Sequence, residues 1–179
     1  MSKTLQKPLY LIGFMGSGKS TVSRHMSHAL GLPKIEMDEL LVQRAGKPIT
    51  QIFAEDGEEV FRQMETALLR EIGAGEPALV SCGGGVVLRS ENVEIMKATG
   101  TILMLSATPQ TIFQRVRHST KRPILNGNMN VEFIAELMAK RDPAYRAAAD
   151  VTVSIDGKTS DVVAKELVER IRKNGGHLS

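Results

Sequence analysis

Five short apolar segments alternate with longer stretches in which apolar residues recur at helical spacing. The apolar segments are PLYLI (residues 8–12), KIEMD (34–38), ALVSC (78–82), TILMLSA (101–107) and VTVSI (151–155), and each has the length of a buried strand. Strands that alternate with helices are typical of a largely parallel sheet with helices on both faces. The pattern therefore predicts an α/β fold with a five-stranded sheet.

The stretches between the predicted strands carry helix signals. We predict helices at residues 20–30, 90–98, 108–118 and 159–174, and in the third of these Pro109 follows Thr108 at the first helical position. A long helical region at residues 49–75 is predicted to break around Asp56 and Gly57. The final residues, NGGHLS, are expected to form a frayed end.

One segment between two predicted helices departs from this regular alternation. Residues 118–130, HSTKRPILNGNMN, contain Pro, Gly, three Asn and two adjacent bases, and the segment is long for a connection in a compact domain. We interpret it as a mobile lid. A passive surface loop is the alternative.

The composition limits the class of protein. With 179 residues the chain has the size of one domain, and its single cysteine, Cys82, excludes an intrachain disulfide and a cysteine metal cluster. Because neither a membrane span nor the apolar core of a signal peptide is recognisable, we expect a cytoplasmic protein. The 23 Lys and Arg are spread among 20 Asp and Glu, and Trp is absent. These counts favour a small polyanionic ligand over nucleic acid.

The stretch GFMGSGKST, residues 13–21, matches the phosphate-binding pattern G-x-x-x-x-G-K-[ST] and lies between the first predicted strand and the first predicted helix. Its glycines allow successive amides to point inward, and the following helix adds the positive end of its dipole. Lys19 would reach the β- and γ-phosphates, and the Ser20 hydroxyl would complete a magnesium shell. The expected ligand is a magnesium–nucleoside triphosphate complex.

The remaining polar residues distinguish transfer of a phosphoryl group from its hydrolysis. The D-x-x-G and N-K-x-D strings of GTPase switches are absent, and the third predicted strand runs into Gly83, Gly84 and Gly85 instead of ending in an acidic residue. Carboxylates gather after the second predicted strand, and arginines are spread over three later elements. Such a set would surround an acceptor that carries hydroxyls and a negative group.

Together these residues resemble the shikimate kinase family, from about Leu9 to Arg172. Six motifs carry the resemblance in the same order: GFMGSGKST, the acidic E-M-D at 36–38, F-R-x-x-E (Phe61, Arg62, Glu65), the triple glycine 83–85, R-x6-R-P-x-L (Arg115, Arg122, Pro123, Leu125) and R-x-x-x-Y-R (Arg141, Tyr145, Arg146). The resemblance implies transfer of the ATP γ-phosphate to the 3-hydroxyl of shikimate, in the route to chorismate and the aromatic amino acids.

The resemblance also implies a role for each site residue. Lys19, Asp38 and Arg122 would carry the chemistry, with Asp38 on the acceptor hydroxyl and Arg122 closing over the phosphates. The expected nucleotide contacts are Gly16, Ser17, Gly18, Lys19, Ser20, Thr21, Arg115 and Arg122, and the expected shikimate contacts are Asp38, Arg62, Gly83, Gly84, Gly85 and Arg146. Magnesium would be held by Ser20, with Glu36 acting through water.

Some of these roles have structural alternatives or depart from the family pattern. Asp38 could serve as a helix N-cap, and Cys82 is most simply a small buried residue. The family usually has D-x-D where this chain has Glu36-Met37-Asp38, so magnesium binding by Glu36 rests on a longer side chain of the same charge. Residues 155–161 should form the adenine loop, although their contacts are not evident from the sequence.

We therefore predict a single P-loop kinase domain over residues 1–179, with a core at about 9–172, a shikimate-binding helical region at about 39–66 and a lid at about 116–130. The expected architecture is a three-layer sandwich with strand order 2-3-1-4-5, and the expected partners are ATP and shikimate, without nucleic acid or membrane, in a monomer. The rival functions are a gluconate kinase-like enzyme of the same class and a catalytically silent nucleotide-binding relative.

Overall fold

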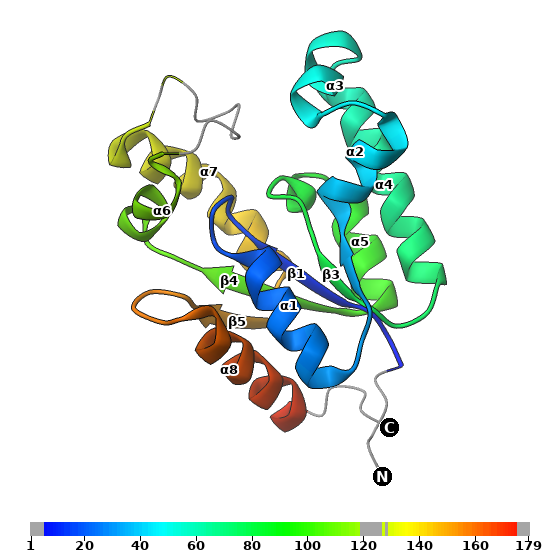
Figure 1. Ribbon diagram of the computed structural model, residues 1–179, viewed down its shortest axis with the longest axis vertical. Coiled ribbons are helices and arrows are strands. Elements are labelled where there is room, and N and C mark those ends of the chain that lie inside the picture. The colour runs from blue at the N-terminus through cyan, green and yellow to red at the C-terminus, as the bar shows by residue number, and fades with distance from the viewer. Residues whose placement is uncertain (1–5, 119–126, 128, 175–179) are drawn as a thin grey trace.

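The computed structural model describes residues 6–118, 127 and 129–174, and these contain one five-stranded parallel sheet (Figure 1). The strands are β1 (Leu9–Gly13), β2 (Lys34–Glu36), β3 (Leu79–Ser81), β4 (Thr101–Ser106) and β5 (Val151–Ser154). Their order is β2-β3-β1-β4-β5, and every neighbouring pair is parallel. The sequence-based prediction of an α/β sheet with this order is confirmed.

Helices cover both faces of the sheet. On one face lie α1 (Lys19–Leu30) and α8 (Ser160–Lys173), whose apolar residues pack with the adjacent strand residues in one cluster. The second cluster lies on the other face and extends to the helices that follow β2, β3 and β4. These are α2 (Met37–Ala45), α3 (Ile49–Glu55), α4 (Glu58–Ala74), the 3-10 helix η1 (Val86–Leu88), α5 (Ser90–Thr99), α6 (Pro109–Val116) and α7 (Val131–Ala148).

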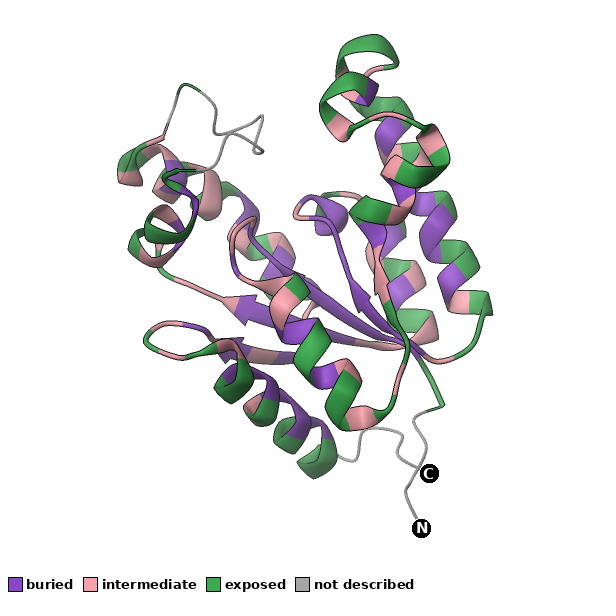
Figure 2. Cartoon of the chain, viewed as in Figure 1, coloured by how far each residue is buried: buried purple, intermediate pink, exposed green. Residues whose placement is uncertain are grey.

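The central strands are the most buried part of the sheet, whereas the edge strand β2 is partly exposed. The central strands are buried along their whole length, whereas the outer faces of the surrounding helices are exposed (Figure 2). β1 contributes Tyr10, Leu11 and Ile12, each 0% exposed. Helices on both faces of the sheet shield the side chains of a central strand from water, and its sequence is therefore a continuous apolar run.

Several predicted boundaries agree with the structure. The long helical region breaks where the sequence indicates, since α3 ends at Glu55 and Gly57, with φ of 91°, precedes α4. Thr108 caps α6 by accepting from the amide of Thr111 at 3.3 Å, and Pro109 occupies the first helical position.

The second strand, in contrast, is shorter than predicted. β2 ends at Glu36, whose register partner on β3 is Ser81. Because β3 also ends at Ser81, a longer β2 would have no neighbour with which to pair. Asp38 therefore lies in the first turn of α2 and not at a strand end, and Glu36, not Asp38, occupies the N-cap position of that helix.

The predicted lid lies largely outside the described residues, which include only its two ends. α6 ends at Val116 and α7 begins at Val131. Within the described part of the chain, no helix has the length and apolar character needed to cross a membrane.

Candidate active site

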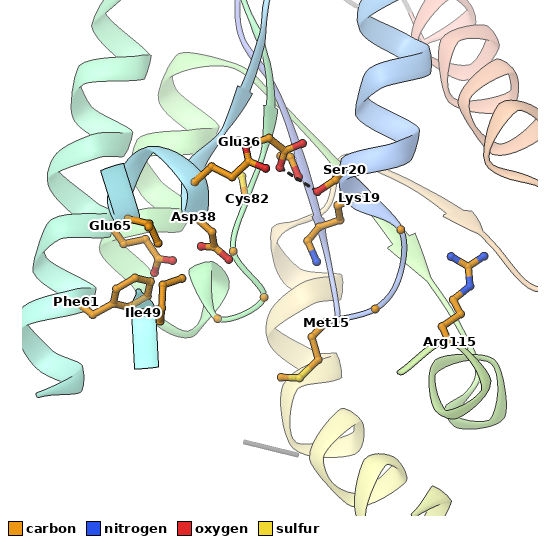
Figure 3. A pocket seen from close by; sticks show the side chains of 18 of the residues that line it. Met15, Lys19, Ser20, Glu36, Asp38, Ile49, Phe61, Glu65, Cys82 and Arg115 are labelled. Atoms are coloured by element: carbon orange, nitrogen blue, oxygen red, sulfur yellow. Dashed lines mark hydrogen bonds between the residues drawn. The ribbon is translucent and has the colours of Figure 1, made fainter. Parts of the chain in front are cut away.

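A cavity of about 1170 Å³ opens at the carboxyl ends of β1, β2 and β3, the edge at which open α/β sheets bind their ligands. Its walls come from the loop after β1, the residues that follow β2, helix α4 and the turn after β3. Residues far apart in the sequence therefore face one space (Figure 3).

Residues 13–21 form the loop between β1 and α1, and its glycines take the backbone through a tight turn. Gly16 has φ of 79° and Gly18 φ of 89°, a region that side-chain-bearing residues rarely occupy. The Ser17 amide donates to the carbonyl of Phe14 at 3.1 Å and closes the turn. The loop ends at the N-terminus of α1, where free amides and the helix dipole attract an anion.

Lys19 and Ser20 begin α1 and face the cavity together with Glu36 (Figure 3). Lys19 Nζ donates to the carbonyl of Gly13 at 2.8 Å. Ser20 Oγ donates to Glu36 Oε2 at 3.0 Å, and Lys34 Nζ lies 3.0 Å from the other oxygen of the same carboxylate. A hydroxyl and a carboxylate next to a phosphate cradle are oxygen ligands of the kind that magnesium prefers, so these residues fit the predicted metal.

Arg115 projects from α6 toward the loop after β1. A Cβ on Gly18 would lie 2.7 Å from Arg115 Nη1, so the guanidinium rests directly on the glycine that precedes Lys19. Lys158, Thr159 and Ser160, from the loop between β5 and α8, also line the cavity. Arg115 and three residues of the segment 155–161, for which the sequence predicts nucleotide contacts, thus line the same cavity as the loop after β1. The contacts themselves stay a prediction.

Asp156 ties that loop to the start of α6. Its Oδ1 accepts from the amide of Thr108 at 3.1 Å and from the hydroxyl of Thr111 at 2.5 Å, and Ser154 Oγ donates to its Oδ2 at 3.3 Å. Burial alone would raise the pKa of Asp156, but the hydrogen bonds from Thr111 and Thr108 outweigh it and lower the pKa. The sequence analysis did not identify this residue, because its partners lie about 45 positions earlier in the chain.

Gly83 and Gly85 lie directly beneath charged side chains of α2 and α4. A Cβ on Gly83 would lie 2.8 Å from Asp38 Oδ1 and 2.9 Å from Glu65 Oε2, and one on Gly85 would lie 2.5 Å from both Nη atoms of Arg62. Neither glycine has a positive φ. A side chain at either position would have to displace these charged groups, so this turn is constrained by space and not by backbone conformation.

Glu65 is a buried acid in the same wall. It is 0% exposed, and its Oε1 accepts from Arg62 Nη1 at 3.1 Å, a contact that orients the Arg62 guanidinium. Its Oε2 has no hydrogen-bond partner among the described residues. Burial raises the pKa of Glu65, and the charge of Arg62 opposes the rise. An unpartnered buried oxygen beside Gly83 is suited to accept a hydrogen bond from a ligand.

Arg146, which the resemblance assigns to the acceptor carboxylate, does not line the cavity. Its side chain is 61% exposed, and its Nε pairs with Asp142 at 2.7 Å. The arginine of α7 that lines the cavity is Arg141, which is 6% exposed and lies with its guanidinium carbon 5.8 Å from the centroid of the Phe14 ring. Five residues along a helix amount to a rotation of roughly 140° beyond a full turn, so the two arginines face different directions.

The sequence contains a signal that distinguishes the two arginines. The buried residues of α7 are Ile134, Arg141, Tyr145 and Ala148, and they recur at intervals of seven, four and three. Arg141 is therefore a charged residue on the apolar stripe of its helix, and Arg146 is off that stripe. A charged residue at a core position of a helix is stronger evidence for a role in the site than membership of a motif alone.

The other predicted site residues divide into those that line the cavity and those that do not. Ser17 and Thr21 do not line it, and the Ser17 side chain is buried behind the loop. Arg122 lies outside the described residues. The predicted residues that line the cavity are Gly16, Gly18, Lys19, Ser20, Glu36, Asp38, Arg62, Gly83, Gly84, Gly85 and Arg115.

The phosphate-binding loop follows the central strand β1, and carboxylates and arginines line the same cavity around the end of the neighbouring strand β3. This combination defines a P-loop kinase for a small acceptor. Comparisons with known proteins identify the family. The model of the family described as shikimate kinase matches residues 15–172, and the shikimate kinase of Dehalococcoides mccartyi is 38% identical over 163 residues, which cover 91% of this chain and 92% of that relative. The chain belongs to the shikimate kinase family.

Solved structures support the same assignment. The shikimate kinase from Acinetobacter baumannii in complex with shikimate has a TM-score of 0.91 and 30% identity, and the match covers 97% of this chain and 96% of that one. A gluconokinase from Sinorhizobium meliloti has a TM-score of 0.54 at 18% identity, over 96% of this chain and 99% of that one. The second likeness shows a shared fold alone, so the comparisons do not favour the gluconate kinase-like alternative.

Proposed function

We propose that the protein transfers the γ-phosphoryl group of ATP to the 3-hydroxyl of shikimate. The observation that carries the proposal is the arrangement around the triple glycine. Asp38, Arg62 and Glu65 meet over Gly83 and Gly85 in the same cavity that the phosphate-binding loop lines. Together with membership of the family, this arrangement supports an acceptor pocket next to a nucleotide site.

The nucleotide is bound by the loop after β1. Its amides and the N-terminus of α1 hold the phosphates, and Lys19 exchanges the carbonyl of Gly13 for phosphate oxygens. Ser20 and Glu36 would hold magnesium. The metal, when bound, neutralises charge on the β- and γ-phosphates. Arg115 and the loop at 155–161 contact the nucleoside end.

The acceptor is bound by groups that match a carboxylate and several hydroxyls. Arg62 and Arg141 both line the cavity, and two guanidinium groups provide the fixed, bidentate donors that a carboxylate requires. Asp38 and the unpartnered oxygen of Glu65 accept hydrogen bonds from hydroxyls. Arg141 takes the role that the sequence assigned to Arg146, because only Arg141 faces the cavity.

In the transfer step the acceptor hydroxyl oxygen attacks the γ-phosphorus, the bond from that phosphorus to the β,γ-bridging oxygen breaks, and ADP leaves. Asp38 orients the hydroxyl and accepts its proton. Lys19 stabilises the charge that develops on the phosphoryl oxygens. Since phosphoryl transfer depends mostly on positioning and charge stabilisation, orientation by Asp38 contributes more than its strength as a base. Arg122, outside the described residues, is proposed to cover the phosphates during transfer.

The test is magnesium-dependent formation of ADP by the purified protein with shikimate, quinate, gluconate or no acceptor. We expect ADP and a phosphorylated product with shikimate alone. Quinate tests whether the ring substituents are recognised, and gluconate tests the alternative acceptor class. If ATP binds but shikimate does not stimulate ADP formation, the assignment of the acceptor is wrong. Phosphorylation of gluconate would identify the rival enzyme, and nucleotide binding without any transfer would identify a catalytically silent relative.

A further inference from the structure

The hydroxyl of Tyr145 connects helix α7 to the triple glycine. Tyr145 is 3% exposed, and its hydroxyl donates a hydrogen bond to the carbonyl oxygen of Gly84 across 61 positions of sequence. Tyr145 is not among the residues that line the cavity. Any influence that it has on a ligand must therefore pass through the groups that it holds.

The three carbonyls of the turn are held in different ways. The Gly83 carbonyl accepts from the amide of Val86 at 3.2 Å, and the Gly85 carbonyl accepts from the amide of Leu88 at 3.1 Å. Both of these bonds are local and belong to the turn and to η1. Among the described residues, the Gly84 carbonyl accepts its hydrogen bond from the side chain of Tyr145. The middle of the turn therefore depends on a partner from a different element.

Holding this carbonyl also fixes the direction of the next amide. In a planar trans peptide the C=O and the following N–H point in opposite directions, and the described residues contain no cis peptide bond. The hydrogen bond from Tyr145 to the Gly84 carbonyl therefore sets the direction of the Gly85 N–H. In the described part of the chain no protein group accepts a hydrogen bond from that amide, and Gly85 lines the cavity.

The same hydroxyl also contacts Arg141, one helical turn earlier on α7. Burial raises the pKa of Tyr145 to about 12, while the charge of Arg141 and a hydrogen bond from it act in the opposite direction. The phenol donates its proton to the carbonyl of Gly84, and the Arg141 guanidinium lies close to the same hydroxyl. Arg141 Nη1 lies 3.9 Å from the position of a Cβ on Gly84, so guanidinium, hydroxyl and glycine turn form one connected group.

We propose that Tyr145 is a positioning residue for the acceptor. Its hydroxyl fixes the Gly84–Gly85 peptide and the Arg141 guanidinium in one geometry, so that an amide donor and a cation face the same ligand. The identity of that ligand as shikimate rests on the proposed function, whereas the positioning of the turn does not.

The chain offers a matched control, because it contains only two tyrosines and both are buried with hydrogen-bonded hydroxyls. Tyr10 is 0% exposed, and its hydroxyl lies 2.7 Å from Thr99 Oγ1. Tyr10→Phe and Tyr145→Phe therefore remove the same atom from two buried sites. Only the second removes a hydrogen bond to the glycine turn, from a hydroxyl that lies close to Arg141.

The first measurement is calorimetric binding of shikimate and of ADP to both variants and to the wild type, with kcat and KM for shikimate. We expect Tyr145→Phe to raise the Kd for shikimate roughly tenfold, as for one lost buried hydrogen bond. The Kd for ADP should be unchanged, and KM for shikimate should change more than kcat. Tyr10→Phe should lower the melting temperature without changing either Kd.

The second measurement needs no substrate. Amide hydrogen exchange at Val86 and Leu88 reports how often the turn opens, and we expect faster exchange in Tyr145→Phe than in Tyr10→Phe. If Tyr145→Phe loses stability but keeps both the wild-type Kd for shikimate and the wild-type exchange, the hydroxyl is merely structural and the inference is wrong. If the wild type itself fails to bind or phosphorylate shikimate, the proposed function fails, and the exchange comparison still decides the positioning of the turn.

Discussion

The two arginines of α7 permit a sharp test of the acceptor pocket. Arg141 is 6% exposed and lines the cavity, whereas the side chain of Arg146, five positions later, is 61% exposed and pairs with Asp142. The substitutions Arg141→Ala and Arg146→Ala remove the same charge from the same helix. Only the first removes a charge that lines the cavity.

The magnitude follows from the kind of contact. A hydrogen bond between charged groups contributes about 1.5–3 kcal/mol, so its loss from a buried site corresponds to a roughly 12- to 150-fold higher Kd for shikimate. Arg141→Lys keeps the charge but loses the planar fork, and we expect it to recover only part of the affinity. Substitution of the exposed Arg146 should change this Kd by less than about twofold.

Calorimetric titration with shikimate, and separately with ADP, measures both affinities in the same preparation of each variant. The ADP titration and the melting temperature show whether the variant is folded, since the packing of Arg141 against Phe14 also contributes to stability. The reasoning is refuted if Arg146→Ala weakens shikimate binding more than Arg141→Ala does. If both variants bind shikimate with the affinity of the wild type, neither arginine contacts the acceptor.

Three further outcomes are expected. Lys19→Ala should lower kcat by at least about 100-fold in steady-state assays, and retention of a wild-type kcat would contradict its role. Asp156→Ala should raise the Kd for ADP roughly fivefold in calorimetric titration, because the loop after β5 loses its bonds to α6, and an unchanged Kd would contradict this role. Burial raises the pKa of Glu65 above its ordinary value of 4.5, so its contribution to stability is complete at lower pH and is lost as the pH rises through the folded-state pKa. In denaturant unfolding, the free energy of unfolding of the wild type should therefore fall as the pH rises above 4.5, and that of Glu65→Gln should fall less. Parallel pH profiles of the two proteins would contradict this.

Much of the fold could be predicted because it is encoded in local patterns. The loop at 13–21 and the break before Gly57 follow from the requirement of glycine for positive φ, observed at 79° to 91° in Gly16, Gly18 and Gly57. Asp38 shows the limit of local reasoning. Its position in a helix and not at a strand end depends on where β3 stops, and that is a property of the neighbouring strand.

Two motifs of the candidate site differ in how much the sequence alone says about their residues. Arg62 and Glu65 lie three positions apart on α4, so helical spacing alone brings them together. Arg141 and Arg146 belong to the same motif, and the choice between them requires the buried face of α7. Asp156 and Tyr145 could not be identified from the chain, because their partners are 45 and 61 positions away and are brought close by the sheet order.

The burial of both tyrosines also determines how the protein can be observed in solution. The chain has no Trp, so the near-ultraviolet absorbance arises chiefly from Tyr10 and Tyr145. Burial raises the pKa of both, and ionisation of either phenol in the native state is therefore displaced toward strongly alkaline solution. One of these two chromophores, Tyr145, is hydrogen-bonded to the glycine turn that lines the cavity, and the other, Tyr10, is bonded to Thr99. Ligand-induced difference spectra of the unlabelled protein can therefore report on the environment of Tyr145. In the variant Tyr10→Phe, Tyr145 is the remaining tyrosine, so its signal is observed alone.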